Sequence, residues 1–324
     1  MGKLSHSQDP SCSKLRGITT HFSGRPFFYA AGTLLLVAVV VIMVYLFGAY
    51  SGRKDLWPIP ALQAIKAKLR PYHFANGQVV DDYGRLVGYR GKQEIRCSPQ
   101  TAKTLVLLIM GQSNAANSGG QREPSRDHVF NYFDGKCYAA SSPLLGTTDI
   151  RGEPWTLLGG KLVDAGVADQ VILVASAMSG TSIVQWQDNA ELNLMLRSVL
   201  TDLAQHYRIT HILWQQGEYD VGVLTKEQYQ QKFMSLVASI RRMGVDAPIY
   251  VAVSTKCELT DLPWTKNNPI AEAQRALPRP EARILPGVDS DSLVEQFDRL
   301  DDCHFGASGQ EKIAASWARI LAGR

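Results

Sequence analysis

The 324-residue sequence predicts an α/β domain with a parallel sheet of about five strands, preceded by one N-terminal transmembrane helix. Two observations carry this prediction. From about residue 101 onward, short continuous apolar runs alternate with segments of helical periodicity, which is typical of a parallel sheet covered by helices on both faces. Closer to the N-terminus lies an uncharged apolar stretch, and a stretch of roughly 20 such residues is what a helix needs to cross a bilayer.

The composition is that of a folded protein, with 45% hydrophobic and 20% charged residues. The formal net charge of +4 is small for this length, and much of it lies near the N-terminus, so we expect no nucleic-acid partner. We divide the chain into a polar tail at 1–26, a transmembrane helix at 27–50, a connector with a small hairpin at 51–100, and the main domain at 101–324.

The apolar stretch covers residues 27–50, and no charged residue occurs between Arg25 and Arg53. Aromatic residues at both of its ends suit the two membrane interfaces. The alternative is a cleaved signal peptide, for which residues 49–51 offer a faint cleavage site, but the apolar run is longer than a typical signal-peptide core. Basic residues flank the stretch on both sides, so charge does not decide its orientation.

The elements of the main domain follow from the pattern in chain order. A weak alternation over residues 78–95, around a turn at 81–84, predicts the hairpin that precedes the sheet. Short apolar runs then predict its strands at 105–110, 171–175, 211–214 and 249–253, with a weaker fifth strand at 282–285.

Helical segments separate these runs. Apolar residues at helical spacing mark one helix face between residues 192 and 207. A capping box at Thr225–Gln228 opens a second helix, and Gly244 ends it. Ser308 is expected to cap the last helix, whose inner apolar face lies at 313–321.

Of the five cysteines, four follow the apolar stretch: Cys97, Cys137, Cys257 and Cys303. Four cysteines allow two disulfides in three pairings, which fits an oxidising compartment, and ordinary buried thiols are the alternative. If Cys257 follows a strand and Cys303 lies in a loop near the C-terminus, a bridge between them would brace that loop. No spacing of Cys with His matches a zinc template, so we expect no metal.

Polar segments follow three of the predicted strands, where parallel sheets place their binding sites. The first is Gly111-Gln112-Ser113-Asn114. Its glycine permits a sharp turn, and Ser113 can begin the next helix, where backbone N–H groups and the helix dipole favour developing negative charge. The alternative is a serine that only caps a helix.

Asp301 and His304 lie three residues apart near the C-terminus. A serine hydroxyl becomes a good nucleophile when a histidine accepts its proton, and a carboxylate then fixes the histidine tautomer. Asp302 and Asp298 compete with Asp301 for the carboxylate role, and we prefer Asp301 because a three-residue turn brings it back to the ring. The alternative is a surface turn that holds an incidental histidine.

Two further segments supply hydrogen-bond donors. Residues 178–182 follow the second strand, and Gly180 permits a backbone N–H to point into a cleft. Gln216 adds a side-chain amide beyond the third strand. Donors placed where charge appears in a tetrahedral intermediate each contribute on the order of 10²–10³ to the rate.

Together, four segments resemble the SGNH hydrolase superfamily, and most closely its sialate O-acetylesterase and carbohydrate esterase family 6 branch. They are Gly111-Gln112-Ser113-Asn114-Ala115, Ser179-Gly180-Thr181-Ser182 with a downstream Trp186, Trp214-x-Gln216-Gly217-Glu218-x-Asp220, and Asp301-x-x-His304-Phe305. The resemblance covers about residues 101–321.

The resemblance implies a flavodoxin-like three-layer α/β/α sandwich that hydrolyses small acyl esters on sugars without a metal or cofactor. Carried over by position, Ser113 is the nucleophile, His304 the base and Asp301 its partner. The backbone of Ser113 and Gly180 and the side chain of Gln216 are the oxyanion donors. The remaining motif residues are expected to shape the site or bind substrate: Gln112, Asn114, Trp186, Glu218 and Asp220.

The sequence therefore predicts a membrane-anchored serine esterase that removes O-acetyl groups from carbohydrate, with its catalytic domain outside the cytoplasm. Tyr219 stands where the branch has a serine, which changes the wall of the cleft but removes no catalytic group. One alternative is a glycan O-acyltransferase that uses the same Ser-His-Asp site. The other is a catalytically inactive, glycan-binding ectodomain on the same scaffold.

Overall fold

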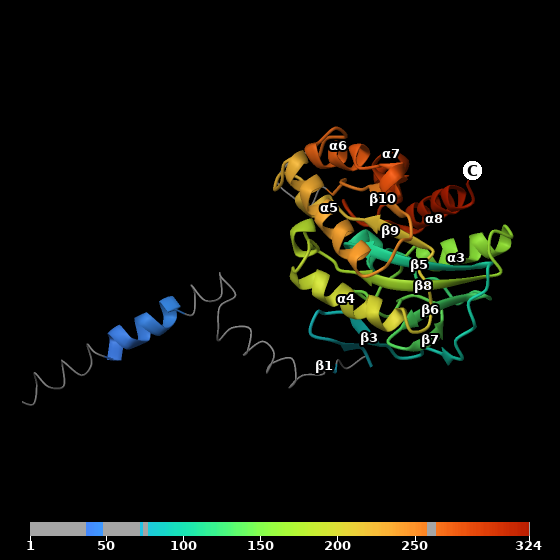
Figure 1. Ribbon diagram of the computed structural model, residues 1–324, viewed down its shortest axis with the longest axis horizontal. Helices are drawn as coiled ribbons and strands as arrows, with labels where there is room; N and C mark the ends of the chain where they lie inside the picture. The colour runs from blue at the N-terminus through green and yellow to red at the C-terminus, as the bar shows by residue number, and fades with distance from the viewer. Residues whose placement is uncertain (1–36, 48–71, 74–76, 258–263, 324) are drawn as a thin grey trace, which may run out of the picture. The chain divides into compact units, whose positions relative to one another are not determined.

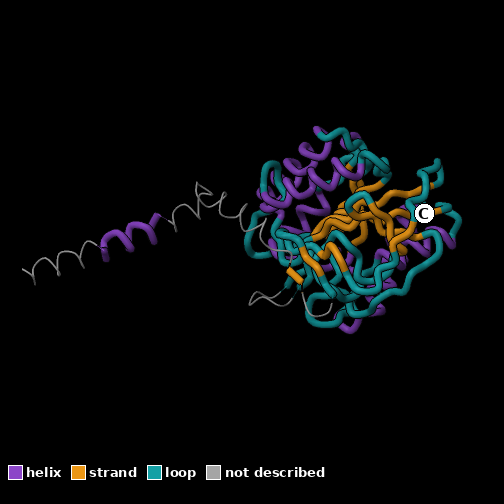
Figure 2. Tube along the Cα trace, turned by 90° about the horizontal axis from the view of Figure 1, so that it is seen from below, coloured by secondary structure: helices purple, strands orange, loops and turns teal. Residues whose placement is uncertain are grey.

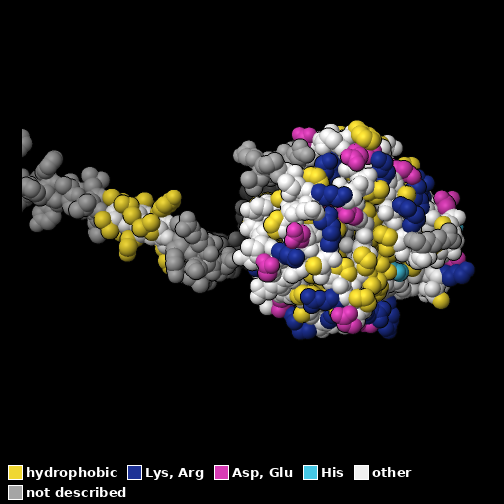
Figure 3. Space-filling view, turned by 90° about the horizontal axis from the view of Figure 1, so that it is seen from above, with side chains coloured by type: hydrophobic (Ala, Val, Ile, Leu, Met, Phe, Trp, Pro, Cys, Tyr) yellow, Lys and Arg dark blue, Asp and Glu magenta, His cyan; other side chains and the backbone are white. Residues whose placement is uncertain are grey.

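The computed structural model describes residues 37–47, 72–73, 77–257 and 264–323. Contacts divide the chain into two units, residues 1–69 and 70–324. The described part of the first unit is a helix at 37–47 whose side chains are all exposed and mostly hydrophobic (Figure 3). None of the described helices is both long and apolar enough to cross a membrane. The span predicted at 27–50 lies largely outside the described residues and stays a prediction.

The second unit is built on an eight-stranded mixed sheet with the order β11-β10-β9-β5-β8-β6-β7-β4 (Figure 1). Its bounds are β4 (Glu94–Ile95), β5 (Thr104–Gly111), β6 (Val129–Phe133), β7 (Lys136–Ala139), β8 (Gln170–Ala177), β9 (His211–Gln215), β10 (Ile249–Val253) and β11 (Ile284–Asp289). All pairs from β11 across to β6 are parallel, and β7 and β4 continue the sheet antiparallel. The five predicted strands are confirmed, and the sheet is larger than the predicted parallel sheet of about five strands, because the parallel β6 and the antiparallel β7 and β4 extend it.

Helices cover both faces of this sheet, so the three-layer arrangement is confirmed (Figure 2). The helices are α3 (Trp155–Asp164), α4 (Glu191–Leu203), α5 (Lys226–Arg242), α6 (Pro269–Ala276), α7 (Ser290–Leu293) and α8 (Ala307–Leu321). The side chains of α4, α5 and α6 pack on one face, and those of α3 and α8 pack on the other. Residues of β5 alternate between the two cores, which is why its sequence is a continuous apolar run.

Several local predictions can be compared with the helix ends. The capping box at Thr225 and Gln228 is present, and α5 ends two residues before Gly244, which has a φ of +79°. The prediction for the last helix is wrong in detail, because α8 begins at Ala307 with Gly306 as its N-cap and without a side-chain cap. Ser308 therefore lies inside the first turn of α8.

The predicted hairpin near 81–84 is confirmed: β2 (Val79–Val80) and β3 (Leu86–Gly88) pair antiparallel, and β1 (Tyr72–His73) adds a third strand. Two disulfides are present, Cys97–Cys137 and Cys257–Cys303. The first joins the end of the predicted connector to β7, and the second is the bridge that the sequence suggested for the C-terminal loop.

Candidate active site

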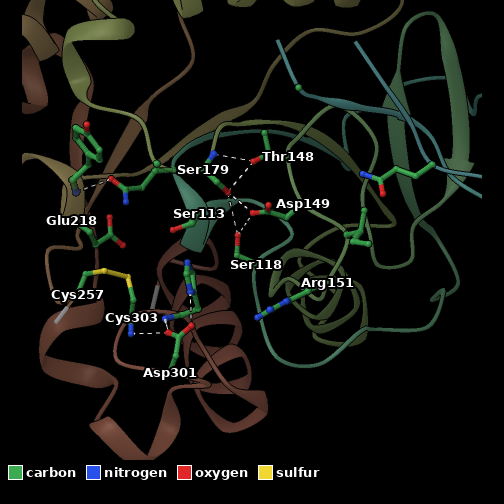
Figure 4. A pocket seen from close by; sticks show the side chains of 17 residues that line it. Ser113, Ser118, Thr148, Asp149, Arg151, Ser179, Glu218, Cys257, Asp301 and Cys303 are labelled. Carbon is green, nitrogen blue, oxygen red and sulfur yellow. Dashed lines mark hydrogen bonds and ion pairs between the residues drawn. A yellow bond between two sulfur atoms is a disulfide. The ribbon is translucent and has the colours of Figure 1, made fainter. Parts of the chain in front are cut away.

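A pocket of about 850 Å³ lies beyond the carboxyl ends of the central strands, and Ser113, Asp301 and His304 all line it (Figure 4). Strand β5 lies between β8 and β9, so the loops after these three strands meet there. Ligands bind at such a point in parallel sheets because neighbouring connections leave on opposite faces. The fold therefore brings together residues that are up to 191 positions apart.

Ser113 reaches the pocket through a turn that only glycine permits. Gly111 has a φ of +138°, and a Cβ added there would lie 1.9 Å from the Gln215 carbonyl oxygen. Ser113 follows at the start of a short 3-10 helix, Ser113–Ala115, instead of the longer helix that the sequence suggested. Ser113 is 6% exposed and lines the pocket.

Asp301 fixes the orientation of His304. Asp301 Oδ2 lies 2.9 Å from His304 Nδ1, and Oδ1 accepts backbone N–H bonds from Cys303 at 2.8 Å and from His304 at 2.6 Å. Partial burial raises the pKa of Asp301, but the hydrogen bonds from His304 and Cys303 outweigh this and hold that pKa below its ordinary value. With Nδ1–H donated to a carboxylate, Nε2 is the nitrogen that can accept a proton.

Asn114 connects the serine loop to the histidine loop. Its Nδ2 donates to the Cys303 carbonyl at 3.2 Å, and its Oδ1 accepts from the Phe305 N–H at 3.2 Å. The residues on both sides of His304 are thus bonded to the residue that follows Ser113. No direct hydrogen bond joins Ser113 to His304 in the described residues, and such contacts commonly tighten only when substrate binds.

The Cys257–Cys303 disulfide braces the same loop. Both cysteines line the pocket, and Cys303 precedes His304 directly (Figure 4). The bridge ties the histidine loop to the segment that follows β10. His304 is therefore held by a covalent link, by Asn114 and by Asp301.

Glu218 is a buried carboxyl group in the wall of the pocket. Its Oε1 accepts from Asn114 Nδ2 and from Ser254 Oγ, both at 2.9 Å, and its Oε2 has no partner among the described residues. Burial raises the pKa of Glu218 to about 7, against the opposing effect of these hydrogen bonds. The side chain joins the serine loop to the end of β10, and its raised pKa keeps it mostly protonated below about pH 7.

Two backbone N–H groups are free to receive an oxyanion. Within the described residues, nothing accepts a hydrogen bond from the N–H of Ser113 or of Gly180, and both residues line the pocket. Gly180 has a φ of +69° with open space where a Cβ would lie, so its conformation rather than crowding favours glycine there. These two positions agree with the donors expected from the sequence.

Gln216 does not reach the pocket. It is fully buried, and its Nε2 donates to Asp220 Oδ2 at 2.7 Å and to the Thr181 carbonyl at 3.0 Å. Because both amide hydrogens are used, Gln216 has none to offer an oxyanion. Its predicted donor role is not supported by this geometry, and the side chain instead ties β9 to the loop after β8.

Gln112 offers the amide that Gln216 lacks. Its Oε1 accepts from the N–H groups of Gly217 at 3.3 Å and Tyr219 at 3.2 Å, while no described residue accepts from its Nε2. The side chain lines the pocket. The residue predicted to bind substrate therefore presents an NH₂ group beside Ser113.

Two other predicted site residues, Asp220 and Trp186, do not line the pocket. Asp220 is fully buried, where it accepts from Ser182 Oγ at 2.5 Å and from the Ile183 N–H at 2.9 Å, and so holds the loop after β8. Trp186 is also fully buried and packs edge-on against Trp214 with ring centroids 5.6 Å apart. Its indole is part of the hydrophobic core that α4 and α5 cover, and it does not face the pocket.

Sequence reasoning missed one wall of the pocket, formed by residues 148–151, which contact Ser118 after β5 and Ser179 after β8. Asp149 accepts hydrogen bonds from the hydroxyls of Ser118 and Ser179, and Thr148 Oγ1 accepts from the Ser179 N–H at 2.9 Å. This wall comes from a loop that follows no strand of the parallel sheet. Its flanking glycines, Gly146 and Gly152, are the signal that could have pointed to it.

The described residues contain no group of three or more His, Cys, Asp or Glu side chains arranged to hold a metal ion. The arrangement that is present consists of a hydroxyl, an imidazole paired with a carboxylate, and unpaired N–H donors around one pocket. Such a set can perform acyl transfer through a covalent acyl-serine.

Comparison with known proteins places these features in a wider group. A family model for carbohydrate esterases, described as sialic acid-specific acetylesterase, matches residues 103–322. No curated protein sequence matches this chain. A solved structure from Arabidopsis thaliana is similar at 18% identity and a TM-score of 0.54, covering 68% of this chain and 98% of the other.

Two further solved structures are similar at lower scores. NanS shares 14% identity at a TM-score of 0.48, covering 70% of this chain and 98% of its own. A carbohydrate acetylesterase from Xanthomonas citri shares 15% identity at a TM-score of 0.43, covering 67% of this chain and 56% of its own. Of these three structures, the one from Arabidopsis has a TM-score above 0.5, and at 18% identity its similarity shows a shared fold alone.

Proposed function

The chain belongs to the sialic acid-specific acetylesterase family of carbohydrate esterases, and from this premise we propose that it hydrolyses O-acetyl esters on sugars with Ser113 as the nucleophile. The observation that carries the proposal is one pocket lined by both Ser113 and His304, with the Nδ1 of His304 held by Asp301. A hydroxyl, a base and an orienting carboxylate are the three groups that serine esterases require.

In the acylation step, Ser113 Oγ attacks the acetyl carbonyl carbon while His304 Nε2 takes the hydroxyl proton. The resulting oxyanion is stabilised by the N–H groups of Ser113 and Gly180. The side-chain amide of Gln112 is the third donor, in the role that the sequence analysis assigned to Gln216. The intermediate then collapses: the bond from the carbonyl carbon to the sugar oxygen breaks, and His304 returns its proton to that oxygen. The sugar alcohol leaves, and the acetyl group stays on Ser113.

In the deacylation step, water takes the place of the sugar. His304 removes one proton as the water oxygen attacks the acetyl carbon, and it then protonates Ser113 Oγ as the acyl bond breaks. Acetate is released and the free serine is restored. Asp301 stays ionised throughout, since hydrogen bonds hold its pKa low and it only stabilises the positive imidazolium.

Anchoring in a membrane is part of the proposal. The uncharged stretch at 27–50 supports a single membrane-spanning helix, and the hydrophobic side chains exposed on the helix at 37–47 fit a lipid environment. The two disulfides support a position of the second unit outside the cytoplasm, because such bonds persist in oxidising compartments. Acylated glycans at that side of the membrane are the substrates that this placement favours.

The test is acetate release by the purified full chain from p-nitrophenyl acetate and from an O-acetylated sugar. Ser113→Ala and His304→Ala are each expected to lose nearly all turnover, whereas Ser292→Ala, which removes an exposed hydroxyl on α7, keeps it. Mass spectrometry is expected to find an acetyl group on Ser113 during turnover. A folded protein without activity on either substrate would contradict hydrolysis and favour the acyltransferase or glycan-binding alternatives.

A further inference from the structure

The β2–β3 hairpin divides the active-site pocket from a second pocket of about 450 Å³. Gln78 and Gly84 line the active-site pocket, whereas Asp81, Arg85 and Val87 line the second one. The other walls of the second pocket come from β6, β8 and α4, which lie next to the hairpin (Figure 1). Because Gly84 and Arg85 are consecutive in the chain, a single segment of the hairpin separates the two pockets.

The hairpin is held in place by the segment that follows it in the active-site wall. The Leu86 N–H donates to the Thr147 carbonyl at 2.8 Å, and the Gly146 N–H donates to the Leu86 carbonyl at 2.8 Å. The next residue, Thr148, lines the active-site pocket. The two pockets therefore keep a fixed spacing, which two sites for one ligand require.

The floor of the second pocket exists because β6 is shorter than β8. The pairing of these strands ends at Asn131 and Leu173, and the next two residues of β8, Val174 and Ala175, line the pocket. Val199 of α4 adds a further apolar side chain. A concave opening of this volume over an apolar floor is typical of small-molecule sites.

One wall of the second pocket is an ion pair beside an aromatic ring. Arg85 Nε donates to Asp81 Oδ2 at 2.7 Å, and the guanidinium carbon lies 5.6 Å from the centre of the Phe133 ring. Asp81 Oδ1 accepts from the N–H groups of Tyr83 at 3.1 Å and of Arg85 at 2.9 Å. Since the Arg85 side chain is 13% exposed, this pair is built into the wall and not a contact between mobile surface groups.

α4 and the turn after β6 supply hydrogen-bond acceptors to the same pocket. Asp202 Oδ2 accepts from the Tyr132 hydroxyl at 2.8 Å and from the Gly135 N–H at 3.2 Å, and no described residue donates to its Oδ1. Asp134 also lines the pocket. The pocket thus combines guanidinium donors, carboxylate acceptors, an aromatic ring and an apolar floor.

This combination fits a sugar ring better than a charged ligand. A sugar hydroxyl both donates and accepts, so one ring can use the Arg85 donors and the Asp202 acceptor together. An anion would meet two carboxylates and a cation would meet the guanidinium, and each such encounter is unfavourable.

We propose that the second pocket binds a further sugar unit of the glycan whose acetylated unit occupies the active-site pocket. This rests on the proposed esterase function. The substrate is then a chain of at least two units that crosses the hairpin. Binding of a unit far from the ester adds to kcat/KM, so acetylated oligosaccharides are better substrates than the acetylated single sugar.

The experiment compares kcat/KM for an O-acetylated xylotriose with that for O-acetylated xylose. A second pair, an O-acetylated disialic acid and O-acetylated N-acetylneuraminic acid, extends the comparison to acidic glycans. The full chain is assayed as wild type, Ser198→Trp and Thr201→Trp. Both hydroxyl residues are exposed on α4 and donate to a carbonyl of the preceding turn, but of the two only Ser198 lines the second pocket, which a tryptophan there would fill.

The wild type and Thr201→Trp are expected to prefer the oligosaccharide by about tenfold in at least one pair, and this ratio falls to about 1 in Ser198→Trp. A ratio in Ser198→Trp equal to that of the wild type would mean that the active-site pocket alone holds the chain, and it overturns the inference. A wild type without any preference for oligosaccharides does the same. Hydrolysis of p-nitrophenyl acetate, which all three proteins are expected to perform equally, separates the two proposals: its absence in the wild type defeats the esterase function, whereas its presence without the oligosaccharide preference defeats only the second pocket.

Discussion

Replacing Glu218 by glutamine is expected to change how the stability of the protein depends on pH. Glu218 is 4% exposed, with Asn114 and Ser254 donating to one oxygen and no described partner for the other. A glutamine keeps an oxygen that can accept both hydrogen bonds, and it cannot ionise. The substitution therefore removes the titration while it preserves the contacts.

The sign and size of the effect follow from the pKa of Glu218. Burial raises this pKa from 4.5 to about 7, so the folded state holds the proton more tightly than the unfolded chain does. The unfolding free energy consequently falls as pH rises from about 4.5 to about 7, and it levels off above that. This difference between the folded and unfolded pKa corresponds to about 3 kcal/mol.

The assay is urea unfolding of wild type and Glu218→Gln from pH 4.5 to 8, followed by tryptophan fluorescence. Other titrating groups cancel in the difference between the two proteins. The variant is expected to gain up to about 3 kcal/mol on the wild type across this range, most of it before pH 7. Glu281→Gln, an exposed position, controls for the loss of one negative charge. Parallel pH profiles for wild type and Glu218→Gln would refute the assignment of a buried, protonated carboxyl group.

Two further predictions concern the histidine loop. Asp301→Asn is expected to lower kcat for p-nitrophenyl acetate by at least about 100-fold with little change in Tm, because an amide no longer fixes the imidazole tautomer. Steady-state kinetics and thermal unfolding of the variant measure the two effects. A kcat within threefold of the wild type would remove Asp301 from the mechanism. Replacing Cys257 and Cys303 together by serine is expected to cost about 4 kcal/mol of unfolding free energy for a separation of 46 residues, and to lower kcat as the base loses its brace. The matched control replaces Cys97 and Cys137, whose disulfide spans a sequence separation of 40 residues and does not line the pocket. Its loss is expected to cost similar stability but to leave kcat unchanged. Equal effects of the two replacements on kcat would contradict the bracing role.

The central strands could be predicted because burial on both faces leaves a continuous apolar run. In β5, Leu107 and Leu108 belong to opposite cores, so the side chains on both faces of the strand are buried. The strands that were missed lack this signal. β6 contains the buried Asn131, whose amide bonds to backbone carbonyls, and β4 has only two residues.

The site was predictable to the extent that strand ends determine it. Ser113 directly follows a strand, and the Asp301–His304 spacing alone makes a hydrogen-bonded pair, so both were found in the pocket. Trp186 was misplaced because a short polar loop does not show which of its side chains turn toward the core. The loop at 148–151 was missed because it follows no strand of the parallel sheet.

The polar residues around Gln216 show why a motif locates a site without assigning each role in it. Gln216 and Asp220 bind each other and the loop after β8, while Glu218 binds Asn114 after β5 and Ser254 after β10. Buried amides and carboxyls cost about 1–3 kcal/mol each when unpaired, so they are stable only where partners from neighbouring loops meet them. These side chains therefore fix four strand ends relative to one another, and the N–H groups and hydroxyl aimed at the ester depend on that frame. The groups that can act on the ester are the few that this frame leaves without a hydrogen-bond partner. The structure identifies these groups through the partners of their neighbours, whereas the sequence motif does not.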